Sequence, residues 1–233
     1  PEFVAEIERR VPAILATPGA VKLAPSTAES IERFDPLPGY LATLGEKVDI
    51  PRIKAAGLRV AVDPMYGSGA GLFEELLAGG KSTVTEIHSE RNPAFPGIRA
   101  PEPIESNLGE FMHLMASRRY DIGIANDGDA DRVVFCDRAG FVGLDEVVAF
   151  VAQYRIRQTT RRSLATTVET GLLPEYAIEA ANGVVVRGRV GDVAVAHLVR
   201  CEDAALGTES VGVYIFPEAG LYPDSMLATL HLL

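Results

Sequence analysis

Cysteine is scarce in this sequence, and long apolar runs are absent from it. Of 233 residues only two are cysteine and none is tryptophan, and no stretch approaches the roughly eighteen uncharged apolar residues that span a bilayer. Cys136 and Cys201 are too few for a disulfide framework, and neither has a C-x-x-C spacing. We expect both to be small buried apolar side chains of a reduced, cytoplasmic protein. The first residues also lack the apolar core of a signal peptide.

Basic residues are fewer than acidic ones. The chain has 22 Lys and Arg against 32 Asp and Glu, which gives a formal net charge of −10. A negative field of this size repels polyanions, so we expect neither nucleic acid nor an anionic membrane among the partners. The one basic cluster, Arg155, Arg157, Arg161 and Arg162, is typical of a solvated helix end.

Short β-branched runs alternate with amphipathic stretches, which predicts a layered α/β fold. The apolar content of 47% is enough for one large or two small domains. Because two strands form a hairpin, the sheet should be mixed. The region 16–51, rich in proline and glycine, is interpreted as a linker. The expected strands are 58–62, 82–87, 120–125, 133–136, 163–168 and 184–186, and the expected helices are 70–77, 104–119, 145–154 and 173–181.

Asp127, Asp129 and Asp131 occupy alternate positions of the stretch NDGDADR, directly after the apolar run 122–125. Three carboxylates within about 5 Å repel by roughly 3 kcal/mol per pair at an effective dielectric near 20. A divalent cation offsets that repulsion, and ligands that are all oxygen select a hard ion such as Mg²⁺. The small residues between the aspartates let the backbone curl so that the carboxylates converge. The stretch therefore predicts a magnesium site.

Two rival motifs fit the sequence less well. An EF-hand calcium loop counted from Asp127 needs glycine at its sixth position and glutamate at its twelfth, but arginine stands at both. A dinucleotide-binding loop at 67–71, with Glu86 as the ribose ligand, needs a glycine where Leu72 stands.

NDGDADR resembles the metal-binding loop F-D-G-D-A/G-D-R of the α-D-phosphohexomutases, the phosphoglucomutase and phosphomannomutase group. Further segments follow in that family's order, so the resemblance covers roughly residues 35–233. They are VDPMYGSG (62–69), FPG with PEP (95–97 and 101–103), VGD (190–192), GTESVG (207–212) and PD (223–224).

The resemblance implies two successive three-layer α/β/α domains with mixed sheets. Residues 1–36 would be the tail of a first domain and a linker, 37–143 a second domain with the metal loop, and 144–233 a third domain with a sugar-binding loop. The implied activity in carbohydrate metabolism is that of an isomerase, an intramolecular phosphotransferase. Such an enzyme interconverts hexose 1-phosphate and hexose 6-phosphate through an Mg²⁺-bound phosphoserine and a 1,6-bisphosphate intermediate. Glucose, mannose and glucosamine phosphates all remain open as substrates.

The resemblance also assigns roles to seven residues. The Mg²⁺ ligands would be Asp127, Asp129 and Asp131, and Arg132 would be the catalytic residue that stabilises charge on the transferring phosphoryl group. The substrate-binding residues would be Glu209, Ser210 and Gly191. A carboxylate accepts hydrogen bonds from two neighbouring hydroxyls, and serine can donate or accept.

Two family motifs are not found in the sequence. They are the serine loop of type T-A-S-H-N-P and the phosphate loop of type R-x-S-G-T-E-P, and the nearest serines, Ser26 and Ser68, lie in the wrong place relative to the matched segments. We therefore expect the partners to be a hexose phosphate and domains 1 and 4 of the same protein, and we expect the chain alone to bind Mg²⁺ weakly without turnover. A non-catalytic scaffold is the alternative.

Four residues depart from the family pattern. Asn126 replaces the usual phenylalanine, Thr208 an acidic residue or methionine, Val211 the first glycine after the serine, and Ser225 the glycine after the aspartate. The scaffold alternative is compatible with the departures at Val211 and Ser225.

Overall fold

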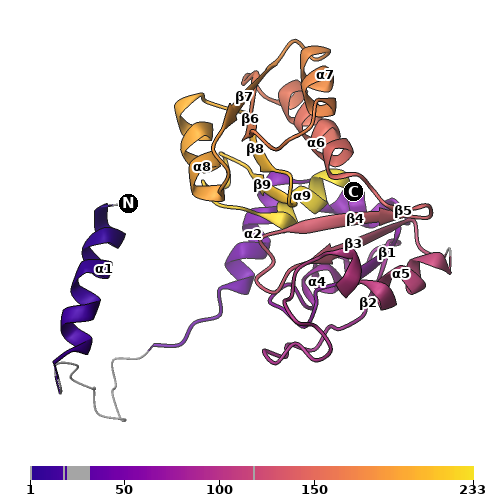
Figure 1. The fold of residues 1–233 in the computed structure, drawn as a ribbon. Helices are drawn as coiled ribbons and strands as arrows, with labels where there is room; N and C mark the ends of the chain where they lie inside the picture. Colours follow the sequence, from indigo (N-terminus) through magenta and orange to yellow (C-terminus); the bar gives the residue numbers. More distant parts are fainter. Residues whose placement is uncertain (1, 18, 20–31, 118) are drawn as a thin grey trace. The chain divides into compact units, whose positions relative to one another are not determined.

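The computed structural model describes residues 2–17, 19, 32–117 and 119–233, which fall into two compact units, 1–38 and 39–233. The first unit contains helix α1 (Glu2–Leu15), on which Glu6 pairs with Arg9 and Arg10. Ser26, one of the two serines considered above, lies outside the described residues. The second unit contains every strand named below (Figure 1).

The first sheet has five strands in the order β2-β1-β3-β4-β5. The first three are parallel, and β4 and β5 are added through antiparallel pairings. One face packs against Phe73 of α4 and the other against Phe111 of α5, which explains why the central strands β1 and β3 are mainly apolar and buried. The bounds are β1 (Arg59–Asp63), α4 (Leu72–Leu77), β2 (Thr83–Glu86), a 3₁₀ turn (Glu105–Asn107), α5 (Gly109–Ala116), β3 (Ile122–Asn126), β4 (Val133–Asp137) and β5 (Gly140–Phe141).

The second sheet has four strands in the order β7-β6-β8-β9, of which only β9 is antiparallel to its neighbour. Leu164 on one face packs in the same cluster as Ile156 of α6 and Ile178 of α7, whereas Ala165 on the other packs with Val195 of α8. The bounds are α6 (Leu144–Gln158), β6 (Ser163–Thr167), α7 (Leu173–Glu179), β7 (Val184–Gly188), α8 (Asp192–Cys201), β8 (Leu206–Glu209), β9 (Val213–Ile215) and α9 (Ser225–Leu232).

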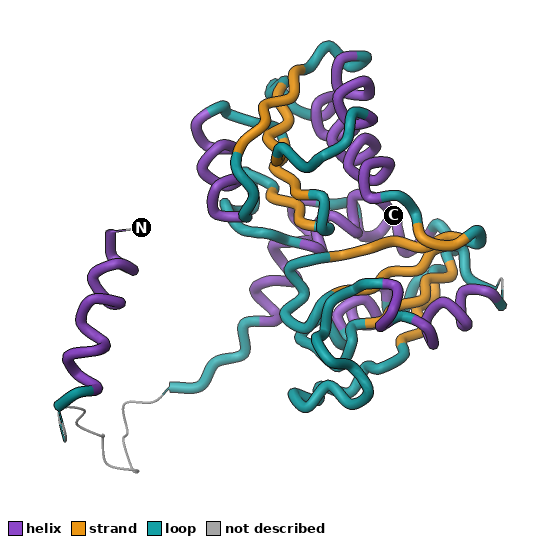
Figure 2. Tube along the Cα trace, in the orientation of Figure 1, coloured by secondary structure: helices purple, strands orange, loops and turns teal. Residues whose placement is uncertain are grey.

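Each sheet is thus a mixed sheet with helices on both faces, and the predicted fold of two successive three-layer α/β/α domains is confirmed (Figure 2). One hydrophobic cluster contains side chains from both sheets, from Val62 of β1 to Leu206 of β8. Among the described residues, no helix is long and apolar enough to cross a membrane.

The interpretation of 16–51 as a linker is wrong for its last part, which forms α2 (Leu37–Lys47) and the start of α3 (Ile50–Ala55). Proline in this region was a misleading signal, because Pro51 lies in the first turn of α3, where its missing N–H costs nothing. Asp49 caps that helix by accepting a hydrogen bond from the Arg52 N–H. The expected helix 104–119 is also shorter, since α5 ends at Ala116.

Two expectations about single side chains are wrong. Cys136 is buried as expected, but Cys201 is exposed at the end of α8, next to His197. Arg155 is not solvated: it is buried beside Phe216 and forms an ion pair with Glu218. Both lie on amphipathic helices whose buried face a single sequence indicates only roughly.

Candidate active site

The acidic loop, residues 127–132, connects β3 to β4 at the carboxyl end of β3. The loop closes on the Asp127 carboxylate, whose Oδ1 accepts the backbone N–H groups of Asp131 at 3.0 Å and Arg132 at 3.1 Å. Ala130 has a φ of 62°, a left-handed conformation that residues with a Cβ rarely adopt. The backbone therefore turns tightly enough for alternate side chains to point to one side.

Two other segments hold the acidic loop from outside. Gly128 donates its N–H to the Pro101 carbonyl at 3.0 Å and accepts the Ser68 N–H at 3.0 Å. The approach is so close that a Cβ on Gly67 would lie 2.4 Å from the Gly128 oxygen. The motifs at 62–69 and 101–103 therefore form a cradle for the acidic loop.

The three carboxylates converge. Each of Asp127, Asp129 and Asp131 offers an oxygen, and these oxygens all lie within 4.8 Å of one another. Asp127 is buried, Asp131 half-buried and Asp129 exposed. Burial, followed by the neighbouring Asp127 and Asp129 carboxylates, raises the pKa of Asp131 to about 7. A set of convergent carboxylate oxygens that is costly to ionise fits a hard divalent cation.

Arg132 lies against the same carboxylates. Its Nε is 2.6 Å from Asp127 Oδ2 and 3.8 Å from Asp131 Oδ1, and its terminal nitrogen is 3.6 Å from Glu102 Oε1. The side chain is 29% exposed, so part of the guanidinium is available to an incoming anion.

Glu209 is the last residue of β8 and is buried. Its Oε1 accepts the Gly191 N–H at 2.6 Å, which fixes the carboxylate against the start of α8. Gly191 has a φ of 118°, a conformation that favours glycine.

One cavity of about 330 Å³ brings the two loops together. Six of the seven residues singled out from the sequence line it. The lining residues are Asp127, Asp129, Asp131, Arg132, Val190, Gly191, Asp192, Glu209, Val211 and Val213. The two sheets also meet at its edge, where Val133 donates its N–H to the Gly212 carbonyl at 3.0 Å.

Ser210 is the residue that the structure does not place in this cavity. Its hydroxyl donates instead to Thr170 Oγ1 at 3.1 Å, and Thr170 in turn contacts Thr166 at 2.6 Å. Val211 lines the cavity in its place. β8 ends at Glu209, so Ser210 and Val211 lie in the turn before β9, and no strand alternation in the sequence indicates which of the two lines the cavity.

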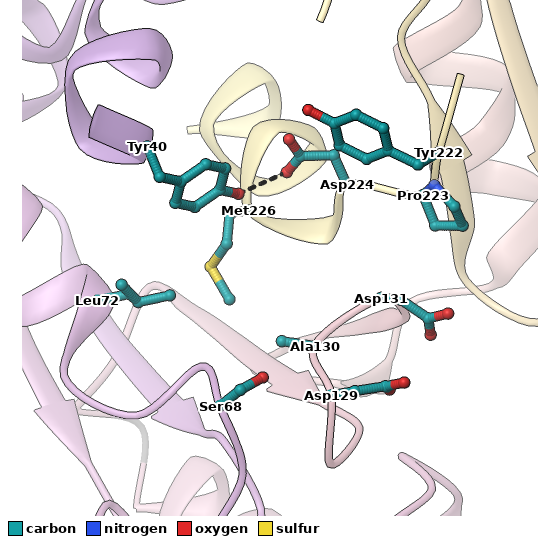
Figure 3. A pocket seen from close by; sticks show the side chains of 10 residues that line it. All are labelled: Tyr40, Ser68, Leu72, Asp129, Ala130, Asp131, Tyr222, Pro223, Asp224 and Met226. Atoms are coloured by element: carbon teal, nitrogen blue, oxygen red, sulfur yellow. Dashed lines mark hydrogen bonds between the residues drawn. The ribbon is translucent and has the colours of Figure 1, made fainter. Parts of the chain in front are cut away.

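A second cavity, of about 230 Å³, lies along the acidic loop and is lined by Ser68, Asp129 and Asp131 among others (Figure 3). In it the Tyr40 hydroxyl donates to Asp224 Oδ1 at 2.8 Å. Tyr40 belongs to α2, so the region first interpreted as linker contributes to the surroundings of the site.

Glu86, the ribose ligand of the dinucleotide-binding alternative, has a different contact. Its Oε2 accepts the Gly71 N–H at 2.8 Å, at the residue that precedes α4. The carboxylate is thus engaged with the N-terminal end of that helix.

Comparison with known proteins gives a consistent result for both sheets. Residues 38–140 match the family model described as phosphoglucomutase/phosphomannomutase, alpha/beta/alpha domain II, and residues 144–233 match the model for alpha/beta/alpha domain III. A probable phosphoglucosamine mutase of Methanopyrus kandleri is 35% identical over 182 residues, which are 78% of this chain and 40% of the relative. A phosphoglucomutase/phosphomannomutase of Thermococcus kodakarensis is 32% identical over 203 residues, 87% of this chain and 44% of the relative.

A solved structure agrees with these matches. The crystal structure of a putative phosphomannomutase from Thermus thermophilus superposes with a TM-score of 0.81 at 27% identity, covering 91% of this chain and 48% of that one. The chain therefore spans less than half the length of each of these three relatives.

Proposed function

Because this chain belongs to the phosphoglucomutase/phosphomannomutase family of α-D-phosphohexomutases, we propose that it forms the metal- and sugar-binding part of an enzyme that interconverts hexose 1-phosphate and hexose 6-phosphate. In this proposal 37–143 is the second domain and 144–233 the third. The main support is the cavity in which the acidic loop faces Glu209 and Gly191.

Asp127, Asp129 and Asp131 are the proposed Mg²⁺ ligands. A bound Mg²⁺ would neutralise charge on a phosphoryl group and on the carboxylates. Asp127 is fixed before any ion arrives, because two backbone N–H groups and Arg132 already contact it. Both lone pairs of Oδ1 are engaged by the two backbone N–H groups, but Oδ2 accepts only the Arg132 Nε–H and retains a lone pair for an ion.

Arg132 has the role of stabilising a transferring phosphoryl group. Its guanidinium is held beside Asp127 yet remains partly exposed in the cavity. Such a group offers several N–H donors in a fixed plane, which matches the oxygens of a phosphate.

Glu209 and Gly191 form the proposed sugar contact. The Gly191 N–H already holds one oxygen of the Glu209 carboxylate, so the other can accept hydrogen bonds from the hydroxyls of a hexose. Ser210, the other residue assigned to the sugar, would act through Thr170 and the turn between β8 and β9. The relatives named above are a probable phosphoglucosamine mutase, a phosphoglucomutase/phosphomannomutase and a putative phosphomannomutase, so glucosamine, glucose and mannose phosphates are the candidate substrates.

The remaining parts of the catalytic machinery would come from outside these two domains. The phosphoserine that donates its phosphoryl group, and the loop that binds the distal phosphate, would come from domains 1 and 4 of the same protein. The 233-residue chain alone should then bind ligands without interconverting them, and its turnover of a hexose phosphate would contradict this part of the proposal.

Binding of glucose 1,6-bisphosphate to the 233-residue chain tests the proposal directly. Calorimetry in the presence of Mg²⁺ should show binding that Glu209→Gln weakens about tenfold, since a charged acceptor of two hydroxyls is lost. Glu202→Gln is the matched control, because Glu202 is exposed at the other end of α8. Absence of any binding, or equal binding by both variants, would favour a non-catalytic scaffold.

A further inference from the structure

Two buried polar side chains join the acidic loop to helix α9. Asn126 ends β3 and Ser225 begins α9, and both are fully buried. Asn126 Nδ2 donates to Ser225 Oγ at 3.0 Å and to the Arg132 carbonyl at 3.2 Å. Ser225 Oγ donates in turn to the Ala130 carbonyl at 2.6 Å. The two side chains thus form one hydrogen-bonded unit, although they are 99 positions apart.

A contribution to the stability of the fold does not by itself explain why two polar side chains are buried here. A buried amide or hydroxyl costs free energy unless it is fully hydrogen-bonded, and an apolar pair of similar size can be equally stable. Asn126 even leaves its Oδ1 without a hydrogen-bond partner among the described residues. The role of the pair is therefore to be found in the backbone groups that its hydrogen bonds hold in place.

The pair holds the two carbonyls on either side of Asp131. Ser225 fixes the carbonyl of Ala130, whose left-handed φ of 62° is costly for a residue with a Cβ. Asn126 fixes the carbonyl of Arg132. Asp131 lies between these two anchored peptide groups, and its direction toward Asp127 and Asp129 depends on them.

The Ser225 end of the pair is itself fixed. Asp224 caps α9 by accepting the Leu227 N–H at 2.8 Å. The same carboxylate oxygen accepts the hydroxyl of Tyr40 from α2, as Figure 3 shows. The hydroxyl of Ser225 therefore projects from a rigid helix start rather than from a loop.

We propose that Asn126 and Ser225 are positioning residues that hold Asp131 in the ion-binding arrangement and couple the acidic loop to α9. This inference rests on the proposed metal site. Both positions are ones where the sequence departs from the family pattern, with asparagine for phenylalanine and serine for glycine. In this chain a direct hydrogen bond of 3.0 Å joins the two side chains.

Binding of Mn²⁺, followed by electron paramagnetic resonance on the 233-residue chain, tests the inference. We expect Ser225→Ala and Asn126→Ala each to weaken Mn²⁺ binding about five- to tenfold. The double variant should lose less affinity than the sum of the two single losses, because both single changes remove the shared hydrogen bond between Asn126 and Ser225. Fully additive losses would overturn the coupling. Should Ser225→Ala fail to fold, Ser225→Cys keeps the size and weakens the hydrogen bond, and it should weaken binding in the same direction.

Thr229→Val is the matched control. Thr229 is fully buried in the same helix and donates to the Ser225 carbonyl at 2.9 Å, yet it has no hydrogen bond to the acidic loop. We expect it to lower the unfolding midpoint in urea while leaving Mn²⁺ affinity unchanged. Equal losses of affinity in Thr229→Val and Ser225→Ala would reduce the pair to a general structural role and overturn the inference. If the wild type binds Mn²⁺ and Ser225→Ala binds it equally well, the inference fails but the metal site stands. If the wild type binds no Mn²⁺, the metal site fails as well.

Discussion

Replacing Asp131 by asparagine should stabilise the metal-free protein and remove its stabilisation by Mg²⁺. The carboxylate oxygens lie within 4.8 Å of one another, a spacing that corresponds to about 3.5 kcal/mol of repulsion per pair at an effective dielectric near 20. The Asp131 side chain is 42% exposed and lies near Arg132, so solvent screening and the guanidinium reduce the net cost to about 1–2 kcal/mol. Asp131→Asn should gain that amount in EDTA at pH 8.

The gain should depend on pH in a defined direction. Burial and the two neighbouring carboxylates raise the pKa of Asp131 to about 7, from an ordinary value of 3.8. The protonated form is therefore favoured in the folded state, and its stabilising contribution is complete below the ordinary value and lost as the pH rises through 7. The difference between wild type and Asp131→Asn should thus be smallest below pH 4, grow between pH 4 and 7, and be largest at pH 8.

Urea unfolding in EDTA and in Mg²⁺ measures both effects. A ligand at ten times its Kd that binds only the folded state adds about 1.4 kcal/mol; wild type should gain about this amount and Asp131→Asn almost none. Glu46→Gln, an exposed carboxylate of α2, serves as the control for a change of one charge. The reasoning is refuted if Asp131→Asn is the less stable protein in EDTA at pH 8, or if Mg²⁺ stabilises both proteins equally.

Three further predictions concern backbone contacts and a half-buried histidine. Gly67→Ala places a Cβ 2.4 Å from the Gly128 oxygen and should cost about 1–3 kcal/mol in urea unfolding, whereas Gly45→Ala, with nothing within 4 Å, should not destabilise. Ala130→Gly should leave the free energy of unfolding within about 0.5 kcal/mol, because relief at φ 62° offsets the added chain entropy; a larger loss would show that the Ala130 Cβ has a packing role. Burial, and then Arg155, lower the pKa of His231 to about 4, so the wild type should lose up to roughly 3 kcal/mol between pH 6.5 and 4, a loss that His231→Phe should not show.

The fold could be predicted largely because the central strands β1, β3 and β6 are buried on both faces. Runs such as 122–125 have no polar position, and the helices between them supply the layers. α2 was missed because Pro38 and Gly39 are typical of a loop. The helix is determined by packing that involves residues far along the chain, such as Tyr40 on Asp224, which no local pattern contains.

Only those features of the site that depend on a single short motif could be predicted from the sequence. The aspartates stand two apart, and their convergence follows from one short loop. Which side chain of the turn faces the cavity depends on where β8 ends. If that end shifted by one residue, Ser210 and Val211 would exchange positions. The pairing of Asn126 with Ser225 spans 99 positions, so only the folded structure shows it.

The number of Mg²⁺ ions bound by the chain tests the central claim most directly. Isothermal titration with Mg²⁺ should give one ion per chain, and the heat should disappear when Asp127, Asp129 and Asp131 are all replaced by asparagine. A chain that takes up no Mg²⁺, or one that binds it equally well without the three carboxylates, would contradict the account.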